Sequence, residues 1–229
     1  MTATTDALPA SWQPSPGLLD ALSAAQRIGA VGPGSLEEHV RHAAGFLAAA
    51  QTAADRSLDP HLRLLDLGSG GGIPGLVLAE LLPHARCTLL DGRTERARLL
   101  DELVEALQWN ERVRARAQRA EEAARDPALR GAFDLVTARG FAAPAVVAEC
   151  AAPFLAPGAL LVVSEPPAGG VSRWPSTGLA PLGLEVLGGA LTLEVAPGQL
   201  GTYQVLRQRS VCPERWPRRT GIPAKRPLF

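Results

Sequence analysis

The stretch Leu62–Leu82, LRLLDLGSGGGIPGLVLAELL, decides the fold of this chain. It begins with an apolar run that holds one acidic residue, Asp66, and continues into four glycines within residues 68–72. Glycine permits positive φ and close approach of the backbone, and Pro74 suits the start of a helix because its missing N–H would be unpaired there anyway. The stretch therefore predicts a buried strand, a glycine-rich turn and a helix whose free amides bind anionic groups.

Two classes of cofactor-binding protein use such a turn. Gly70, Gly72 and Gly75 match the G-x-G-x-x-G fingerprint of dinucleotide-binding proteins. The series from Asp66 to Gly72 also matches the acidic-x-G-x-G-x-G loop of S-adenosylmethionine (SAM) methyltransferases. A carboxylate at the strand end would repel a pyrophosphate, whereas SAM carries an amino group and a sulfonium cation there. The position of Asp66 therefore favours SAM, and a purely structural glycine turn in another α/β protein is the remaining alternative.

Length and composition narrow the class of protein. A chain of 229 residues is expected to form one α/β domain with additions. Because 23 basic residues balance 23 acidic ones, any contact with nucleic acid depends on a local patch. The three cysteines are far apart and form no C-x-x-C, which predicts neither a metal site nor a disulfide framework and fits a reducing compartment. Without a signal peptide or an apolar run long enough to span a membrane, we expect a cytoplasmic protein.

Periodicity predicts the order of the elements. We expect N-terminal helices at 18–31 and 35–53, later helices at 93–108 and 144–155, strands after the first at 85–90, 113–118, 133–138 and 160–163, and an antiparallel pair from 184–195 and 202–208. This order predicts an α/β fold with a mostly parallel sheet, an antiparallel edge and an N-terminal helical extension. His39 and His42, at i and i+3, are interpreted as histidines of the helix surface or core rather than metal ligands.

Polar residues follow several predicted strands at the edge where open α/β sheets bind ligands. Asp91 comes directly after the second strand, about 20 residues past the glycines, and is expected to bind ribose hydroxyls. Ala120 and Glu121 lie in the loop after the third strand, which surrounds the adenine in a SAM-binding fold. Arg139 follows the fourth strand and is expected to face the ligand crevice, where we expect it to be the catalytic residue that orients the methyl donor and the acceptor.

The tail 207–229, RQRSVCPERWPRRTGIPAKRPLF, is strongly basic, with seven basic residues against one acid. Its four prolines are expected to prevent a helix, so we predict an extended arm. Phosphate neutralisation together with a stacking surface, here Trp216, is typical of RNA binding. The expected RNA contacts are Arg215, Arg218, Arg219, Lys225 and Arg226.

Five segments resemble the bacterial 16S rRNA guanine-N7 methyltransferase family, known as RsmG or glucose-inhibited division protein B. They are 65–75 (LDLGSGGGIPG), 89–98 (LLD with Arg96 and Arg98), 119–121 (RAE), 139–142 (RGFA) and 217–228 (PRRTGIPAKRPL). The resemblance implies a class I SAM methyltransferase fold with a helical N-terminal extension, acting on the 16S rRNA of the 30S subunit. It also implies that Gly68 and Ile73 line SAM, that Ala120 and Glu121 lie at its adenine end, and that Arg139 lies between SAM and the substrate. We expect the protein to be a monomer.

The chain also departs from that family. Ser164–Glu165 stands where the family has Lys-Gly, so that an RNA contact is lost and a repelling charge is added. A divergent paralogue with another acceptor and a non-catalytic protein that binds SAM and RNA are therefore alternatives, followed by a small-molecule methyltransferase and an NAD-dependent dehydrogenase. We expect three parts: a helical extension (1–56), a SAM-dependent methyltransferase domain (57–210) and a basic, proline-rich arm (211–229).

Overall fold

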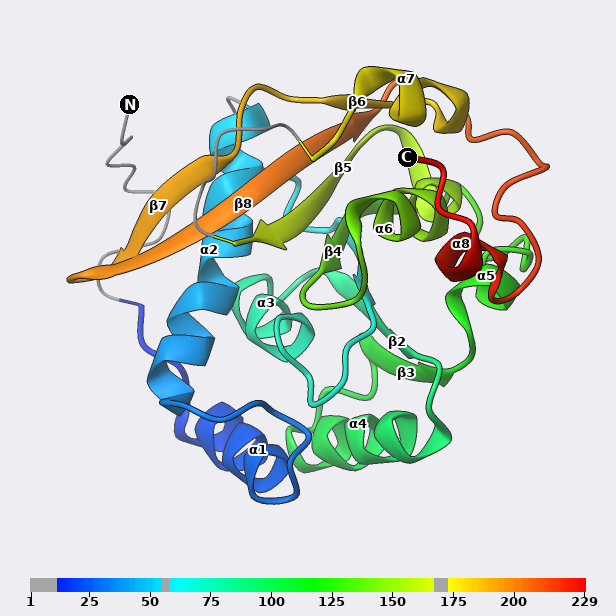
Figure 1. The fold of residues 1–229 in the computed structure, drawn as a ribbon. Coiled ribbons are helices and arrows are strands. Elements are labelled where there is room, and N and C mark those ends of the chain that lie inside the picture. Colours follow the sequence, from blue (N-terminus) through cyan, green and yellow to red (C-terminus); the bar gives the residue numbers. More distant parts are fainter. Residues whose placement is uncertain (1–11, 55–57, 167–172) are drawn as a thin grey trace.

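The computed structural model of the chain describes residues 12–54, 58–166 and 173–229. These residues form an eight-stranded sheet in the order β3-β2-β1-β4-β5-β8-β6, with β7 paired to the first half of β8 (Figure 1). The strands are β1 (Arg63–Leu67), β2 (Arg86–Asp91), β3 (Val113–Ala117), β4 (Phe133–Ala138), β5 (Leu155–Glu165), β6 (Leu184–Val186), β7 (Leu191–Ala196) and β8 (Gln199–Gln208). The helices are α1 (Pro16–Arg27), α2 (Leu36–Ala54), α3 (Gly75–Leu81), α4 (Thr94–Ala106), α5 (Ala120–Ala123), α6 (Pro144–Ala151), α7 (Ser176–Leu179) and α8 (Ile222–Lys225), with 3₁₀ turns η1 (Ala152–Phe154) and η2 (Ala180–Leu182).

Strands β1 to β5 run parallel, and β8 pairs antiparallel with β5, β6 and β7. The predicted mostly parallel sheet with an antiparallel edge is therefore confirmed. The chain moves outward from β1 to β3 and then returns to the other side of β1 with β4. The carboxyl ends of β1 and β4 consequently border a topological switch point, where open α/β sheets bind their ligands.

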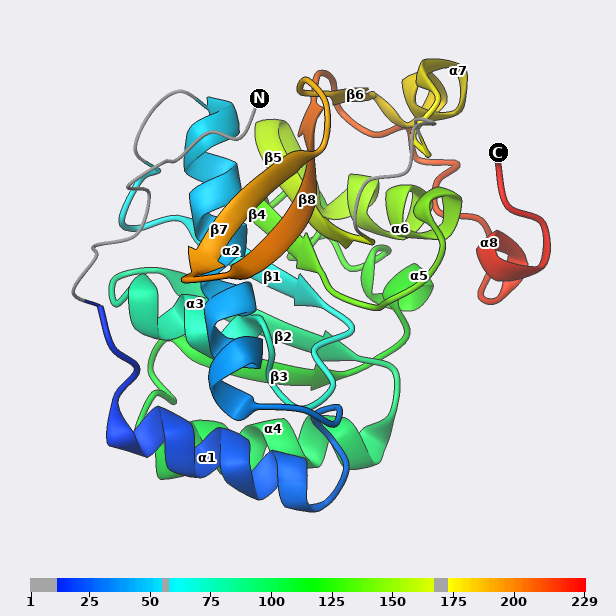
Figure 2. The same cartoon turned by 60° about the vertical axis from the view of Figure 1, so that its left-hand side comes forward.

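Two hydrophobic cores cover the two faces of the sheet. Helices α1 to α4 pack on the face that carries Leu64, Leu89 and Leu135. Helices α5 to α7 pack on the face that carries Leu65 and Val136 (Figure 2). Because successive side chains of a strand point to opposite faces of the sheet, neighbouring residues such as Leu64 and Leu65 enter different cores.

The N-terminal helices belong to the same core as the central sheet. Leu22 of α1 and Phe46 of α2 are fully buried in the cluster that contains Leu64. Ser15 caps α1 by accepting a hydrogen bond from Leu18 N at 3.2 Å, and at the start of α2 the Ser35 hydroxyl accepts one from Glu38 N at 3.4 Å. None of the described helices has the length and apolar character needed to cross a bilayer.

Several predicted elements differ in extent from the observed ones. The expected helix 144–155 ends at Ala151, and β5 then begins at Leu155, well before the predicted residue 160. The expected strand 184–195 is divided into β6 and β7. The interruption lies at Gly188, whose φ of +68° is a conformation that continues no strand.

The tail is folded against the body of the protein, so the expected extended arm is wrong as a conformation. Arg218 forms a bidentate ion pair with Glu149 of α6, with an Nη2–Oε2 distance of 2.6 Å. Gly221 N donates to Glu121 at 2.9 Å. A short helix, α8, also forms despite the prolines, because Pro223 occupies its first turn, where no backbone N–H is needed.

The ion pair in the tail predicts a stability effect. Glu149 is fully buried, so replacing Arg218 with Gln removes its only cationic partner among the described residues and leaves the backbone N–H of residue 218 as a neutral donor. We expect Arg218→Gln to lower the free energy of unfolding by about 3 kcal/mol in urea denaturation. The neighbouring Arg219 is exposed, and Arg219→Gln is the matched control, expected to change stability by less than about 0.5 kcal/mol. Equal stability of the two variants would contradict this role of Arg218.

Candidate functional site

The glycine-rich loop leaves β1 and folds over the end of β2. Gly68 N and Ser69 N both donate to Leu90 O, at 2.8 and 3.1 Å. Gly68, Gly70 and Gly72 have φ of +77°, +55° and +94°, a backbone conformation that residues other than glycine rarely adopt. The predicted strand, glycine turn and helix are therefore all present, with α3 beginning at Gly75.

We expected Asp66 to face the pocket, but the structure buries its side chain beneath the loop. Its carboxylate accepts hydrogen bonds from Thr137 Oγ1 at 2.9 Å and from Gly75 N at 3.0 Å. Alternation along β1 explains this direction, since Asp66 shares a face with Leu64 and therefore points toward α3. Burial raises the pKa of Asp66 to about 6, and the hydrogen bonds oppose this shift. The carboxylate is thus ionised at neutral pH, where it joins β1, β4 and the start of α3.

Asp91 lies at the pocket, as predicted. Its Oδ2 accepts from Gly70 N at 3.0 Å, and its Oδ1 accepts from Arg93 N at 2.9 Å. The carboxylate is half-buried and keeps free lone pairs beside the glycine loop. It therefore fixes the loop and leaves a hydrogen-bond acceptor at the pocket.

A pocket of about 330 Å³ opens at the carboxyl ends of β1, β2 and β4. Ala30 and Phe141 close it from the helical extension and from the loop after β4, and the lining residues are Ala30, Gly68, Gly70, Asp91, Gly92, Arg93, Arg96, Arg119, Gly140 and Phe141. Arg96 donates to Gly29 O at 3.3 Å, while its other terminal nitrogen, Nη1, is buried without a partner among the described residues. Bare glycine backbone, one carboxylate and an unsatisfied donor suit the hydroxyls and polar atoms of a SAM molecule.

Arg139 also points away from the pocket, and only its neighbours Gly140 and Phe141 line it. Leu135, Thr137 and Arg139 alternate onto the same face of β4, so the guanidinium lies against α2. There its Nη2 lies 2.7 Å from His39 Nδ1. Burial lowers the pKa of Arg139, and the electrostatic influence of Tyr203 and Asp66 opposes this shift. In this structure the Arg139 side chain therefore contacts His39 and does not line the pocket, and its role toward the ligand stays a prediction.

His39 links Arg139 to the loop between α1 and α2. Because Arg139 has only donors, His39 Nδ1 is the acceptor, and the proton is on Nε2, which lies 3.2 Å from Gly32 O and 3.0 Å from Pro33 O. Burial, followed by repulsion from Arg139, lowers the pKa of His42 to about 4, so this ring is neutral too. Within residues 12–54, 58–166 and 173–229 no three His, Cys, Asp or Glu residues gather to hold a metal ion.

The remaining predicted cofactor residues lie behind the pocket lining. Ile73 and Ala120 are buried, and neither is among the residues that line the pocket. Glu121 is also buried, and its Oε1 accepts from Gly221 N of the tail and from Arg119 at 3.4 Å. Glu121 thus holds the tail and orients Arg119, which does line the pocket.

The five predicted RNA contacts have different surroundings. Arg215, Arg219, Lys225 and Arg226 are exposed, with the Arg215 guanidinium 5.6 Å from the centre of the Trp216 ring. Arg218 is engaged by Glu149 and also donates to Arg226 O at 2.7 Å. Four of the five side chains are therefore accessible to a ligand, while Arg218 holds the tail in place.

Glu165, the acidic departure from the family pattern, has partners within the protein. Arg173 Nη1 lies 2.5 Å from its Oε2, and Trp174 Nε1 donates to its Oε1 at 2.9 Å. Only 8% of its side-chain surface is exposed. Its charge is balanced internally, so the repulsion of RNA that the sequence suggested is largely removed.

Comparison with known proteins identifies the relatives of this chain. A family model described as rRNA small subunit methyltransferase G matches residues 24–164. A ribosomal RNA small subunit methyltransferase G of Synechococcus sp. is 38% identical over 172 residues, covering 73% of this chain and 71% of the relative. The protein of the same name from Dictyoglomus thermophilum is 32% identical over 170 residues, covering 73% and 69%.

Solved structures confirm the predicted class I methyltransferase fold. A putative O-methyltransferase from Klebsiella pneumoniae aligns with a TM-score of 0.58 at 18% identity, covering 88% of this chain and 94% of that one. A putative sarcosine dimethylglycine methyltransferase from Galdieria sulphuraria aligns with a TM-score of 0.58 at 11% identity, covering 82% and 98%. At these identities the likeness concerns the fold alone.

Asp66 gives the stability of the protein a specific dependence on pH. Its pKa is about 6 in the folded protein and 3.8 without the fold, so folding favours the protonated form. The stability that this preference contributes is complete below pH 4 and is lost as the pH rises through 6. In denaturation at pH 4, 5, 6 and 7, we expect the stability of the native protein relative to Asp66→Asn to fall by on the order of 3 kcal/mol. A difference that does not vary with pH would contradict the assignment.

Proposed function

Because this chain belongs to the rRNA small subunit methyltransferase G family, we propose that it transfers a methyl group from SAM to N7 of a guanine in 16S rRNA. The observation that carries the proposal is the pocket at the switch point, where Asp91 and the glycine loop meet. The match to the family spans the loop, both neighbouring strands and the segment after β4. The protein is a SAM-dependent rRNA methyltransferase, and guanine N7 is the acceptor atom that we assign to it.

The chemistry asks little of the protein beyond positioning. SAM supplies a methyl group bound to a positively charged sulfur, and guanine N7 has a lone pair and no proton to remove. The residues of the chain therefore bind and orient both partners, and the rate enhancement comes from proximity. Of the pocket residues, only Asp91 carries a carboxylate, and its two hydrogen bonds to backbone amides fit a binding role better than that of a general base.

We assign cofactor binding to residues in direct and indirect roles. Gly68 and Gly70 present backbone, and Asp91 accepts from the ribose hydroxyls. Four further residues do not line the pocket, and we assign them the indirect role of holding the loop and the residues around the adenine end: Asp66, Ile73, Ala120 and Glu121. Asp66 does so by accepting from Gly75 N, and Glu121 by accepting from Arg119. Arg139 holds the segment 140–141 against the helical extension through His39, between the cofactor and the RNA.

We further propose that the substrate is the 30S subunit, that the enzyme acts as a monomer and that it works in the cytoplasm. The exposed basic residues of the tail, Arg215, Arg219, Lys225 and Arg226, supply RNA contacts, and Arg218 keeps them in position. The chain then divides into a helical extension (1–56), a methyltransferase domain (57–210) and a basic C-terminal segment (211–229). These roles agree with the exposed Arg215 guanidinium beside Trp216.

Asp91 provides a direct test of cofactor binding. Asp91→Asn keeps the size of the side chain and removes its charge, so a charge-assisted hydrogen bond to the ribose is weakened. We expect the SAM dissociation constant to rise by about 10- to 100-fold in isothermal titration calorimetry. Asp101→Asn, at an exposed position of α4, removes the same charge away from the pocket and is the control. Native affinity in Asp91→Asn would show that Asp91 binds no part of the cofactor.

The reaction itself is tested with 30S subunits whose 16S rRNA lacks guanine-N7 methylation. We expect labelled methyl from SAM to appear at one guanine N7, because a single site has to fit the pocket and the RNA-binding surface together. The label is mapped on the isolated rRNA, and 50S subunits serve as the control acceptor. If SAM raises the melting temperature but no label is transferred, the protein binds the cofactor and uses another acceptor or none.

A further inference from the structure

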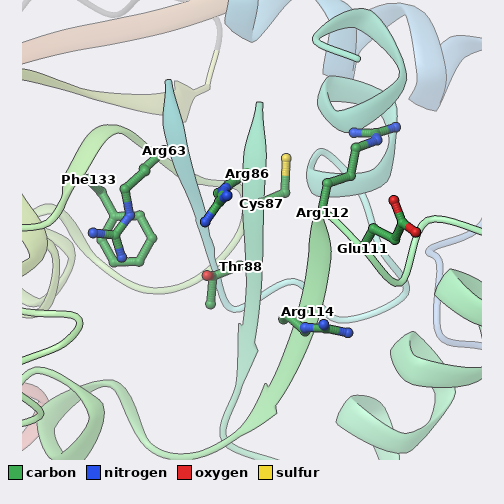
Figure 3. A pocket seen from close by; sticks show the side chains of 8 residues that line it. All are labelled: Arg63, Arg86, Cys87, Thr88, Glu111, Arg112, Arg114 and Phe133. Atoms are coloured by element: carbon green, nitrogen blue, oxygen red, sulfur yellow. The ribbon is translucent and has the colours of Figure 1, made fainter. Parts of the chain in front are cut away.

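A second hollow lies at the opposite ends of the strands from the cofactor pocket. It has a volume of about 480 Å³ and lies at the amino ends of β1 to β4 (Figure 3). Its lining is rich in arginine and contains one acidic side chain: Arg63, Arg86, Cys87, Thr88, Glu111, Arg112, Arg114 and Phe133. The chain as a whole has no net charge, so this concentration of positive charge is a local feature.

The sequence of β2 and β3 explains why this part of the sheet stays open. On the face covered by α1 to α4, the two strands contribute Cys87, Leu89 and Val113 to the core. On the other face only Leu90 enters a core. The alternate positions there are Arg86, Thr88, Arg114 and Arg116, which the four-residue helix α5 leaves without an apolar cover. We call Arg63, Arg86, Thr88 and Arg114 the basic sheet face.

The register brings these side chains together. Arg63 is paired with Arg86 and Thr88 with Arg114, so all four project from the same side of three adjacent strands (Figure 3). Neighbouring strands lie about 4.8 Å apart, a spacing that lets guanidinium groups on adjacent strands reach one anionic ligand. Such a row of like charges on a sheet is unfavourable in the absence of a counter-charge.

Two of the arginines have contacts within the protein. The Arg63 guanidinium lies 5.0 Å from the centre of the Phe133 ring and donates to Ala128 O at 3.3 Å. Arg112 donates to Ala79 O at 2.8 Å, which draws its side chain toward α3. These contacts fix the rim of the hollow.

Arg86 and Arg114 are exposed, and their side chains make no hydrogen bond or ion pair to other described residues. The acidic groups nearby are exposed Glu111, exposed Asp134, which accepts from Arg63 N, and Asp126, which pairs with Arg116 at 3.5 Å. Two guanidinium groups are therefore free to bind an anion.

We propose that the basic sheet face binds the phosphate backbone of the RNA substrate at a place remote from the methylated base. Arginine binds phosphate through two parallel N–H groups, and an open face on three strands suits an extended polyanion better than a small enclosed anion. A strand of six residues is about 20 Å long, so this contact lies roughly that far from the cofactor pocket. The proposal rests on the proposed function, because it takes the RNA as the substrate.

The double variant Arg86→Gln/Arg114→Gln tests this surface in the full-length protein. Loss of two phosphate contacts should weaken binding to 30S subunits and reduce the slope of log affinity against log salt by roughly two. The matched control, Arg27→Gln/Arg98→Gln, removes two charges from exposed arginines of α1 and α4, outside both the basic sheet face and the tail. SAM affinity and melting temperature are measured for all three proteins and are expected to stay unchanged, since none of these residues lines the cofactor pocket.

The outcomes separate this inference from the proposed function. A reduced slope and a raised KM for 30S subunits in the double variant alone support the basic sheet face, with kcat unchanged. Equal slopes in the double variant and the control overturn it while methyl transfer still stands. Loss of inorganic tripolyphosphate binding with an unchanged RNA slope also overturns it, because the site then binds a small anion. If the native protein neither binds nor methylates 30S subunits, the proposed function fails, and this inference with it.

Discussion

The buried carboxylate of Asp66 is the constraint on which the cofactor site depends. An ionised group in an apolar core is costly, and it is tolerated only when hydrogen bonds and nearby charge compensate it. Asp66 receives Thr137 Oγ1 and Gly75 N, so one side chain joins β1, β4 and the start of α3. A Cβ on Gly75 would lie 2.7 Å from Asp66 Oδ2, which requires glycine there. Asp66 thus holds the strands and the helix at the switch point together without lining the pocket itself.

The helical extension completes the site from the other side. A Cβ on Gly71 would meet the backbone of Ala30 at 2.8 Å, so the loop after α1 rests directly on the glycine loop. Arg96 of α4 donates to Gly29 O, and His39 of α2 bridges the same connection to Arg139. A sheet domain without α1 and α2 would therefore lack one wall of the pocket and the support of the segment after β4.

Local patterns in the sequence predicted the loop, the strands and Asp91, because each depends on neighbours within a few residues. The directions of Asp66 and Arg139 were missed, although alternation from Leu64 and Leu135 would have placed both on the face covered by α2 and α3. The fold of the tail depends on Glu149 and Glu121, which are distant in sequence. A lone glutamate in the apolar helix 144–151 was the available signal, since a buried charge requires a partner. Which arginine would supply it could not be read from spacing.

The arrangement of charges explains how a chain without net charge can recognise a polyanion. Several guanidinium groups form ion pairs within the protein and so stabilise the fold. These pairs are Arg218–Glu149, Arg173–Glu165 and Arg116–Asp126. A uniformly basic protein would adhere to any RNA, and its affinity would carry little information about shape. When internal ion pairs separate the guanidinium groups that remain free, we expect a ligand to gain full binding energy only if its phosphates match their spacing. Selection by geometry then replaces attraction by net charge, and the same internal ion pairs that stabilise the fold sharpen the choice of substrate.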